Sequence, residues 1–307
     1  MIIVRTPLRL SIAGGGTDLP SWYKNHGSMF ISAAINKYIY ITLQKTRYND
    51  SINLRYSEIE DVKNVSEIKH DIIRETLKKF KVSGNISLTS HADIPSGTGL
   101  GSSGSFGVSI AHALHPRAPK HVLARMSTDV QMYSLHLSIG LQDQYAAAYG
   151  GFNVYTIEKN GAIDIQPLDI HPYFQKRLVL FYTGIKRDAN QILSSSNDKG
   201  LERIQEIANL SKAALEKENF DAYGLLLNEH WEYKKKRHPE MSSPEIDRLY
   251  ELGMKHGALG GKLIGAGGGG FMMFYAKDPK KLIDNIPNHE PFEFDWDGSK
   301  VIYENLC

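Results

Sequence analysis

Short stretches rich in β-branched and aromatic residues recur along the chain, and the first of them alternates between apolar and polar positions. Both features are typical of β-strands. The strands predicted in this way cover 2–13, 29–45 (one or two strands), 85–93, 151–157, 163–168, 177–184, and two short strands around a glycine hinge within 260–276. Between the fourth and fifth of these ranges, Asn160-Gly161 favours a tight hairpin turn.

Other stretches space their apolar residues three and four positions apart, as an amphipathic helix does. In the stretch 66–81 these residues are Ile68, Ile72, Ile73, Leu77 and Phe80. Ser66 is the expected N-cap of that helix. Further helices are predicted over 106–114, 119–137, 188–196, 201–217, 219–236, 244–257 and 278–286. Because strands and helices mix without strict βαβ alternation, the pattern predicts an α+β fold.

The sequence divides near residue 170. After His171-Pro172 a single strand is followed by a run of helices, whereas strands dominate before it. A length of 307 residues also corresponds to about two domains. We therefore predict an N-terminal domain over 1–170 and a C-terminal domain over 171–307.

Composition and charge narrow the class of protein. A hydrophobic content of 41% and a net charge of +2 are ordinary for a globular protein, and they argue against a nucleic-acid or membrane-surface partner. The single cysteine, Cys307, excludes a disulfide within the chain. No signal peptide or membrane span is evident, so we expect a cytoplasmic protein with small-molecule partners. A homodimer is compatible with this sequence.

A glycine-rich loop is the first candidate for chemistry. Residues 99–104 spell G-x-G-x-x-G between a predicted strand and a predicted helix. A dinucleotide-binding loop also needs an acidic residue about 20 positions further on, where Ala124 stands and Asp129 is the nearest acid. No lysine follows the glycines, which excludes a Walker A loop, and no H-R-D or D-F-G segment supports a protein kinase.

A different phosphate cradle fits this loop. Glycines let several backbone N–H groups converge on anionic oxygens, and the helix that follows turns its positive end toward the same point. Ser102 and Ser103 could add hydroxyls toward phosphate or Mg²⁺. A flexible loop before a serine-capped helix, without a ligand, is the alternative that the residues alone leave open.

Three ordered motifs resemble the GHMP small-molecule kinases. They are Pro95 to Ser103 (P-x-x-x-G-L-G-S-S), Thr6 to Asp18, and Lys262 to Phe271. The resemblance implies an N-terminal domain of the ribosomal-protein-S5 type, a ferredoxin-like C-terminal domain, and ATP and a sugar phosphate bound between them. It assigns ATP to Pro95, Gly97, Gly99, Gly101, Ser102, Ser103 and Gly104.

A fourth segment, Gly140 to Asn153, is similar to the sugar-kinase branch of that family. Together with Ala13 to Asp18 it most resembles D-glycero-D-manno-heptose 7-phosphate kinases. These phosphorylate the anomeric C1 hydroxyl to give the 1,7-bisphosphate, on the way to nucleotide-activated heptose for surface polysaccharide. Fucokinase-like enzymes share much of the pattern, so another monosaccharide 1-kinase is an alternative, as is a non-catalytic sugar- and nucleotide-binding protein of this fold.

The resemblance implies a role for each matching polar residue. Asp143 matches the family's catalytic aspartate and Arg9 the arginine of the first motif, with a helix cap and a strand-surface arginine as the alternatives. Asp18 matches a sugar-binding aspartate, unless it forms only a local turn. Gly16 and Thr17 precede it as substrate-binding candidates, and the run Gly14-Gly15-Gly16 replaces the Gly-Glu-His of galactokinases.

Ligands for magnesium and for the substrate phosphate complete the assignments. Ser103 is the expected Mg²⁺ ligand, while the family's glutamate falls near Gln131, two residues from Asp129. Lys186 and Arg187 are the candidates for the 7-phosphate. The run Lys234 to His238 we interpret as a solvated helix end. The glycine run 265–270 is expected to pack beside the phosphate loop.

Overall fold

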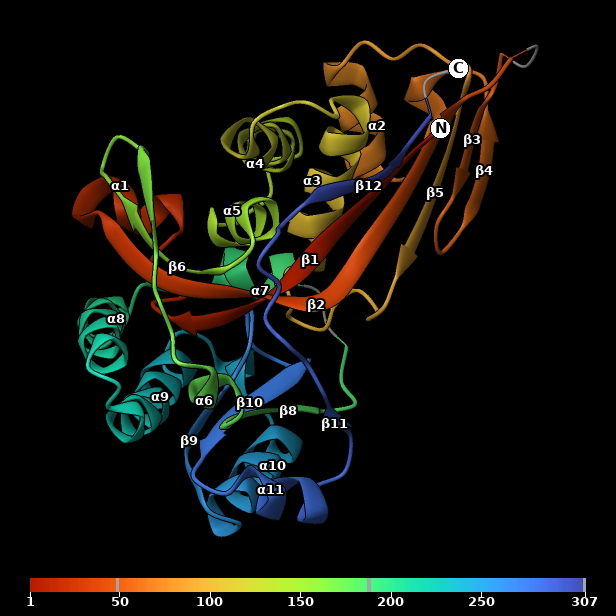
Figure 1. Ribbon diagram of the computed structural model, residues 1–307. Coiled ribbons are helices and arrows are strands. Elements are labelled where there is room, and N and C mark those ends of the chain that lie inside the picture. The colour runs from red at the N-terminus through yellow and green to blue at the C-terminus, as the bar shows by residue number, and fades with distance from the viewer. Residues whose placement is uncertain (48–49, 187–188, 306–307) are drawn as a thin grey trace.

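The computed structural model describes residues 1–47, 50–186 and 189–305, and in this part of the chain two β-sheets carry the helices (Figure 1). The larger sheet has the strand order β12-β1-β2-β5-β3-β4, with β6 also paired to β2 and β7 paired to β6. Its strands are β1 Ile2–Ala13, β2 Ser28–Lys45, β3 Ile52–Arg55, β4 Ile59–Val62, β5 Ile86–Ala92, β6 Phe152–Ile157, β7 Ile163–Pro167 and β12 Lys300–Glu304. The smaller sheet has the order β11-β8-β10-β9. Its strands are β8 Leu178–Tyr182, β9 Ala258–Leu263, β10 Phe271–Ala276 and β11 His289–Glu290.

Helices separate the strands along most of the chain. They are α1 Pro20–His26, α2 Asp71–Lys79, α3 Ser102–Leu114, α4 Lys120–Asp129, α5 Gln142–Tyr149, α6 Pro172–Gln175, α7 Ala189–Ser195, α8 Leu201–Glu216, α9 Phe220–Lys235, α10 Pro244–Lys255 and α11 Pro279–Asn285. Two 3₁₀ turns, Val65–Glu67 and Pro239–Met241, and a π-helical turn, Val130–Ser134, complete the described helical structure. The predicted α+β class is confirmed. None of the helices described is long and apolar enough to span a bilayer.

Strand β1 is covered on both faces along its second half. Helices α3 and α5 contact it, and so does α8, which also packs on β2 (Figure 1). A strand buried on both faces needs no polar face, and nine of the last ten residues of β1, ending at Ala13, are buried. Arg9 is one of them, so a guanidinium group lies inside this layer and needs partners there.

The two sheets share one apolar core. Phe174 of α6 is fully buried, with its ring centroid 5.9 Å from Phe152 of β6 and 5.1 Å from Tyr223 of α9. The hydroxyl of Tyr223 donates to the carbonyl of Ile12 in β1, at 3.2 Å. Truncation of such a ring to alanine costs about 3–5 kcal/mol. This contact region fixes the smaller sheet against the larger one.

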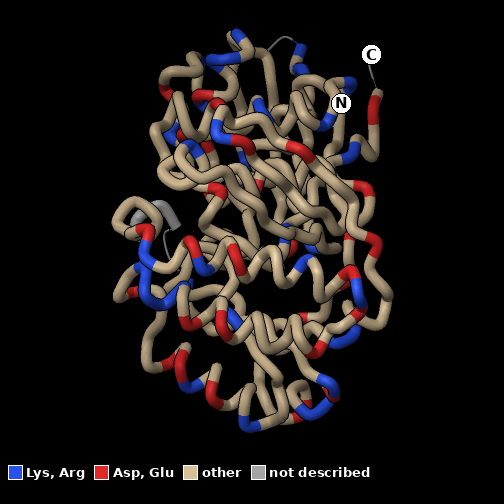
Figure 2. The backbone as a smooth tube through the Cα atoms, turned by 90° about the vertical axis from the view of Figure 1, so that its left-hand side faces the viewer, with Lys and Arg blue, Asp and Glu red and all other residues tan. Residues whose placement is uncertain are grey.

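Both ends of the described chain meet at the larger sheet. Strand β12 pairs with β1 in antiparallel register, with Ile2 opposite Glu304 (Figure 1). The division of the chain at residue 170 stays a prediction. Figure 2 shows basic and acidic residues interspersed over the side of the molecule that it presents, in keeping with the small net charge.

The helix predicted over 66–81 was wrong in its first turn. Helix α2 begins at Asp71, and Ser66 is not its N-cap. The Glu60 carboxylate accepts the N–H groups of Lys69 and His70, at 2.7 and 3.3 Å, and this holds the preceding segment in an extended form. The period of apolar residues cannot reveal a side chain ten positions away that competes for the backbone.

Other boundaries moved for local reasons. Helix α3 begins at Ser102, four residues before the predicted start, because Gly101 (φ 78°) turns the chain directly into it. The helix predicted over 119–137 ends its α-helical part at Asp129, and the residues 29–45 form one strand. The sequence interpretation did not include α1, β3, β4, α5, α6, β11 and β12.

Candidate active site

A cavity of about 850 Å³ lies where the predicted motifs meet. Five separate parts of the chain contribute the lining residues named here. Among the lining residues are Arg9, Gly16 and Asp18 from the first motif, Gly97 to Ser103 except Thr98 and Leu100, Gln142 and Asp143 at the start of α5, His230, Lys234 and Arg237 from α9 and the turn after it, and Lys262 and Gly265 from β9 and its following loop. The segment from Gly97 to Ser103 is the glycine-rich loop.

The glycine-rich loop adopts the backbone form that a phosphate cradle requires. Gly97, Gly99 and Gly101 all have φ between 77° and 83°, a region that side chains disfavour. Helix α3 starts at once, and no side chain caps its first turn. Among the described residues, the buried hydroxyl of Ser102 also finds no hydrogen-bond partner. Free N–H groups, a free hydroxyl and a helix N-terminus all favour an anion at this point.

The glycine run of the third motif packs on this loop, as predicted. A Cβ atom at Gly265 would lie 2.5 Å from the carbonyl oxygen of Gly99, and one at Gly270 would lie 2.0 Å from that of Thr98. Only glycine permits backbones to approach so closely. The loop is therefore held between the two sheets.

Arg9 joins the loop to Asp143. Its Nη2 and Nε atoms lie 2.7 and 2.9 Å from one carboxylate oxygen of Asp143, and its Nη1 donates to the carbonyl of Gly99 at 2.7 Å. A Cβ at Gly104 would lie 2.6 Å from Cβ of Asp143, so glycine in α3 lets α5 bring the carboxylate up to the loop. Arg9 is 4% exposed and Asp143 33%, so the carboxylate stays open to the cavity.

Asp18 ties the first motif to the same helix. One carboxylate oxygen accepts the N–H of Gly16 and the other that of Gln142, both at 3.0 Å. Burial raises the pKa of Asp18, and the charge of Asp143 adds to that shift. The contact with Gln142 means that Asp18 is more than a local turn.

Thr17 and Pro95 do not line the cavity. Thr17 is fully buried, and its hydroxyl bonds the Gly14 carbonyl at 2.8 Å and the Ser28 hydroxyl at 2.7 Å. Pro95 is exposed, and its carbonyl accepts the hydroxyl of Thr98 at 2.9 Å. Both residues hold the shape of their loops.

Lys186 is exposed and is not among the residues that line the cavity, whereas Arg187 lies outside the described residues. The run Lys234 to His238 was interpreted as solvated, and this was wrong for Lys234 and Arg237, which are 6% and 3% exposed. Together with His230 they recur at i, i+4 and i+7, the spacing of one helix face, and this signal could have identified them.

The buried cations differ in what they contact. Lys234 donates to the carbonyls of Leu263 and Gly265, at 2.7 and 2.6 Å, and so holds the glycine hairpin. Lys262 is 2% exposed, with its Nζ atom 3.4 Å from Nδ1 of His230. Burial, together with the charge of Arg9, lowers the pKa of Lys262 to about 7. Burial also places the pKa of His230 well below its usual value.

Ser103, the expected Mg²⁺ ligand, contacts the side-chain amide of Gln131, near the position where the resemblance implied a glutamate. The hydroxyl of Ser103 donates to Oε1 of Gln131 at 2.9 Å, and Gln131 is held in turn by Ser127 at 2.9 Å. Asp129 points elsewhere and pairs with Lys79 at 3.0 Å. Hydroxyl and amide oxygens fit Mg²⁺, which keeps several waters and takes further oxygens from bound phosphates.

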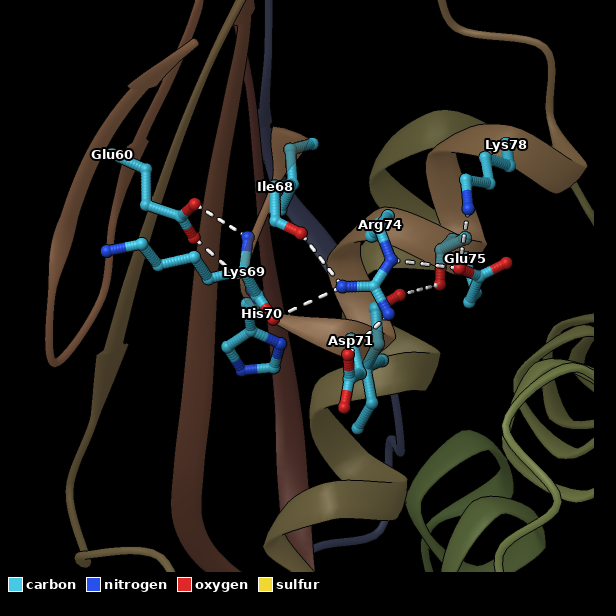
Figure 3. Close-up of polar contacts among 10 residues, drawn as sticks. Glu60, Ile68, Lys69, His70, Asp71, Arg74, Glu75 and Lys78 are labelled. Carbon is cyan, nitrogen blue, oxygen red and sulfur yellow. Dashed lines mark hydrogen bonds and ion pairs between the residues drawn. The ribbon is translucent and has the colours of Figure 1, made fainter. Parts of the chain in front are cut away.

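One part of the cavity wall, called the aromatic end below, is formed by Tyr56, His70 and Phe106. Tyr56 and His70 lie edge to face with ring centroids 4.8 Å apart, and His70 is 4.9 Å from Phe106. Figure 3 shows how the segment before α2 is fixed: Glu60 takes the N–H groups of Lys69 and His70, and Arg74 donates to the carbonyl of Ile68 at 2.8 Å. The sequence interpretation had assigned no function to this end of the site.

Comparisons with known proteins show which family this chain resembles. Residues 66–151 match the model of the GHMP kinases N terminal domain, and residues 211–291 match that of the GHMP kinases C terminal. The D-glycero-alpha-D-manno-heptose 7-phosphate kinase of Campylobacter jejuni is 32% identical, over 97% of both chains. A solved D-glycero-D-manno-heptose 1-phosphate kinase from Bacteroides thetaiotaomicron superposes with a TM-score of 0.80 at 25% identity, over 100% of both chains.

A more distant relative, the L-fucokinase/L-fucose-1-P guanylyltransferase of Bacteroides fragilis, is 26% identical over 92% of this chain and 36% of its own length. These similarities show that the chain belongs to the GHMP kinase family, and the predicted fold is confirmed. Within that family it is a sugar kinase, an ATP-dependent phosphotransferase with a hydroxyl group as acceptor.

Proposed function

We propose that the protein transfers the γ-phosphoryl group of ATP to the anomeric C1 hydroxyl of D-glycero-D-manno-heptose 7-phosphate. The product is the 1,7-bisphosphate, a precursor of nucleotide-activated heptose for surface polysaccharide. The reaction takes place in the cytoplasm. The observation that carries the proposal is the Arg9–Asp143 pair, which joins the glycine-rich loop to an open carboxylate in one cavity. The name of the Campylobacter relative supports the substrate.

In this proposal the polyphosphate of ATP lies on the glycine-rich loop. The N–H groups at the start of α3 and the hydroxyl of Ser102 bind its oxygens. The nucleoside reaches toward the aromatic end formed by Tyr56, His70 and Phe106, where flat rings suit a planar base. Mg²⁺ would be held by Ser103 beside Gln131, and it would neutralise charge on the phosphates.

Asp143 acts on the acceptor hydroxyl. Its carboxylate accepts the proton of the C1 hydroxyl, or orients that hydroxyl, as the hydroxyl oxygen forms a bond to the γ-phosphorus. The bond from that phosphorus to the bridging oxygen of ADP breaks, and ADP leaves with that electron pair. Arg9 holds the carboxylate in place and is within reach of charge that builds on the phosphoryl group. Asp18 and Gly16 face the sugar, since both line the cavity beside Gln142.

The proposal is tested by following ADP release from Mg²⁺-ATP with a panel of sugars and sugar phosphates. We expect turnover with heptose 7-phosphate and at least 100-fold lower kcat/KM with unphosphorylated fucose or galactose, about the discrimination that one buried charged contact supplies. Preference for fucose would favour the fucokinase-like alternative, which the Bacteroides fragilis relative supports. ATP binding without turnover of any sugar would favour a non-catalytic role.

A further inference from the structure

Arg237 is a buried cation without an anion. It follows α9 directly, lines the cavity and is 3% exposed. Its Nε atom donates to the carbonyl of Asn197 at 3.1 Å, while its Nη2 atom is buried and has no hydrogen-bond partner. Within the described residues, no carboxylate forms an ion pair with it at 4.0 Å or less. The two N–H groups of Nη2, out of the five on the guanidinium, therefore have no partner among the described residues.

Such an arrangement is costly unless a ligand completes it. Removing a guanidinium from water is unfavourable when no negative charge and few acceptors replace the water. Burial lowers the pKa of Arg237, and the carboxylates of Asp198 and Asp18 offset only part of that shift. The parallel N–H groups on the two terminal nitrogens of a guanidinium match two oxygens of a phosphate in a planar, bidentate contact.

Arg237 lies on the sugar side of the cavity. A Cβ atom at Gly16 would lie 2.3 Å from its Nη1 atom, so the guanidinium rests on the loop that carries Asp18. The glycine-rich loop takes its own contacts from Arg9 and Gly265 instead. The glycine at position 16, in the run where galactokinases carry Gly-Glu-His, makes room for this arginine.

We propose that Arg237 binds the phosphate ester that the acceptor sugar already carries, and that it selects phosphorylated over unphosphorylated sugars. This inference rests on the proposed function, because it takes the acceptor to be a sugar phosphate. It takes the place of Lys186 as the residue expected at that phosphate, since Lys186 does not line the cavity, whereas Arg187 lies outside the described residues. Arg237 takes no part in the transfer step itself.

The test compares Arg237→Met and Arg237→Lys with Lys236→Met, a matched control because Lys236 is the neighbouring cation and is exposed. The quantities are kcat and KM for heptose 7-phosphate and for the same heptose without its phosphate, at saturating Mg²⁺-ATP. We expect Arg237→Met to lower kcat/KM about 100-fold for the phosphorylated sugar only, mostly through KM. Arg237→Lys should be intermediate, and Lys236→Met should match the wild type.

Two results would overturn the assignment. Equal losses with both heptoses would mean that Arg237 supports the fold or the transfer step, and a raised KM for ATP would place it at the nucleotide. Thermal melting of each variant separates loss of structure from loss of a contact. If Arg237→Met does not fold, the test falls to Arg237→Lys. Its loss of kcat/KM must then still be larger for heptose 7-phosphate than for the same heptose without its phosphate.

A second experiment keeps this inference distinct from the proposed function. Inorganic phosphate is titrated calorimetrically into the wild type and Arg237→Met, each saturated with a non-hydrolysable ATP analogue that fills the glycine-rich loop. Binding to the wild type alone supports the anion site even if heptose 7-phosphate proves not to be the substrate. Equal heats for both proteins, including no heat for either, contradict it.

Discussion

Arg9 and Arg237 are two arginines of one cavity, and both are nearly fully buried. Arg9 has a carboxylate at 2.7 Å and a carbonyl at the same distance, so the protein itself completes its contacts. Arg237 has one carbonyl at 3.1 Å and a free buried nitrogen. The difference separates two kinds of site: one that is complete before any ligand arrives, and one that a ligand must complete.

The largest effect on activity should come from the Arg9–Asp143 pair, whose contacts the protein itself completes. We expect Asp143→Asn to lower kcat about 100- to 10,000-fold, because the amide can no longer accept the proton and loses its charged contact with Arg9. ATP affinity should stay within about threefold of the wild type, since the loop is unchanged. Steady-state kinetics and nucleotide titration measure the two quantities. A wild-type rate would show that Asp143 is not the base.

A smaller loss of activity is expected from a change at Gly16, which lies against the guanidinium of Arg237. In Gly16→Ala the new methyl group would overlap the guanidinium of Arg237, and φ at this position is 99°. We expect KM for the sugar phosphate to rise about tenfold with little change in KM for ATP. An unchanged KM for the sugar phosphate would show that the guanidinium can move without consequence, and the comparison would lose its basis.

The pH dependence of stability should report the buried amine of Lys262. The folded pKa of Lys262 is about 7, far below its unfolded value of 10.5. Between these values the unfolded chain binds more protons, so stability rises with pH, by about 1 kcal/mol per unit between pH 7 and 9. Lys262→Met should flatten this slope in denaturant titrations, whereas Lys236→Met should not. Equal slopes for Lys262→Met and the wild type would contradict the low pKa.

The smallest expected effect concerns the metal. Gln131→Glu would place a carboxylate beside Ser103, where the structure has an amide. We expect the Mg²⁺ concentration for half-maximal activity to fall severalfold, by about the 0.5–1.5 kcal/mol of one improved contact. Titration of activity with Mg²⁺ at fixed ATP measures it. A rise in that concentration would mean that Gln131 does not face the metal.

The same comparison explains what the sequence could reveal. The glycines at Gly99 and Gly101 leave a local signal, so the loop could be predicted. Arg9 and Asp143 were assigned through the family resemblance, and the structure brings the two side chains together. Arg237 could not be placed in the same way, because a basic run at a helix end is usually solvated. Its burial depends on Gly16, more than 200 residues away, and on the packing of α8 and α9.

The extended segment before α2 teaches the same lesson. Ile68 and Ile72 fit a helical period, yet the Glu60 carboxylate accepts the N–H groups of Lys69 and His70, and the helix starts only at Asp71. Figure 3 shows this contact, and His70 is one of the residues that line the cavity. Long-range hydrogen bonds of this kind outweigh local propensity, which contributes only tenths of a kcal/mol per residue.

The central claim is that the cavity transfers phosphate from ATP to C1 of a sugar phosphate with Asp143 as base. Phosphorus NMR of the product formed from heptose 7-phosphate and Mg²⁺-ATP tests it most directly. We predict a new phosphate resonance coupled to the anomeric proton, beside the unchanged 7-phosphate, formed by the wild type and at a rate at least 100-fold lower by Asp143→Asn. A new phosphate at any other carbon, or equal rates for the two proteins, would contradict the account.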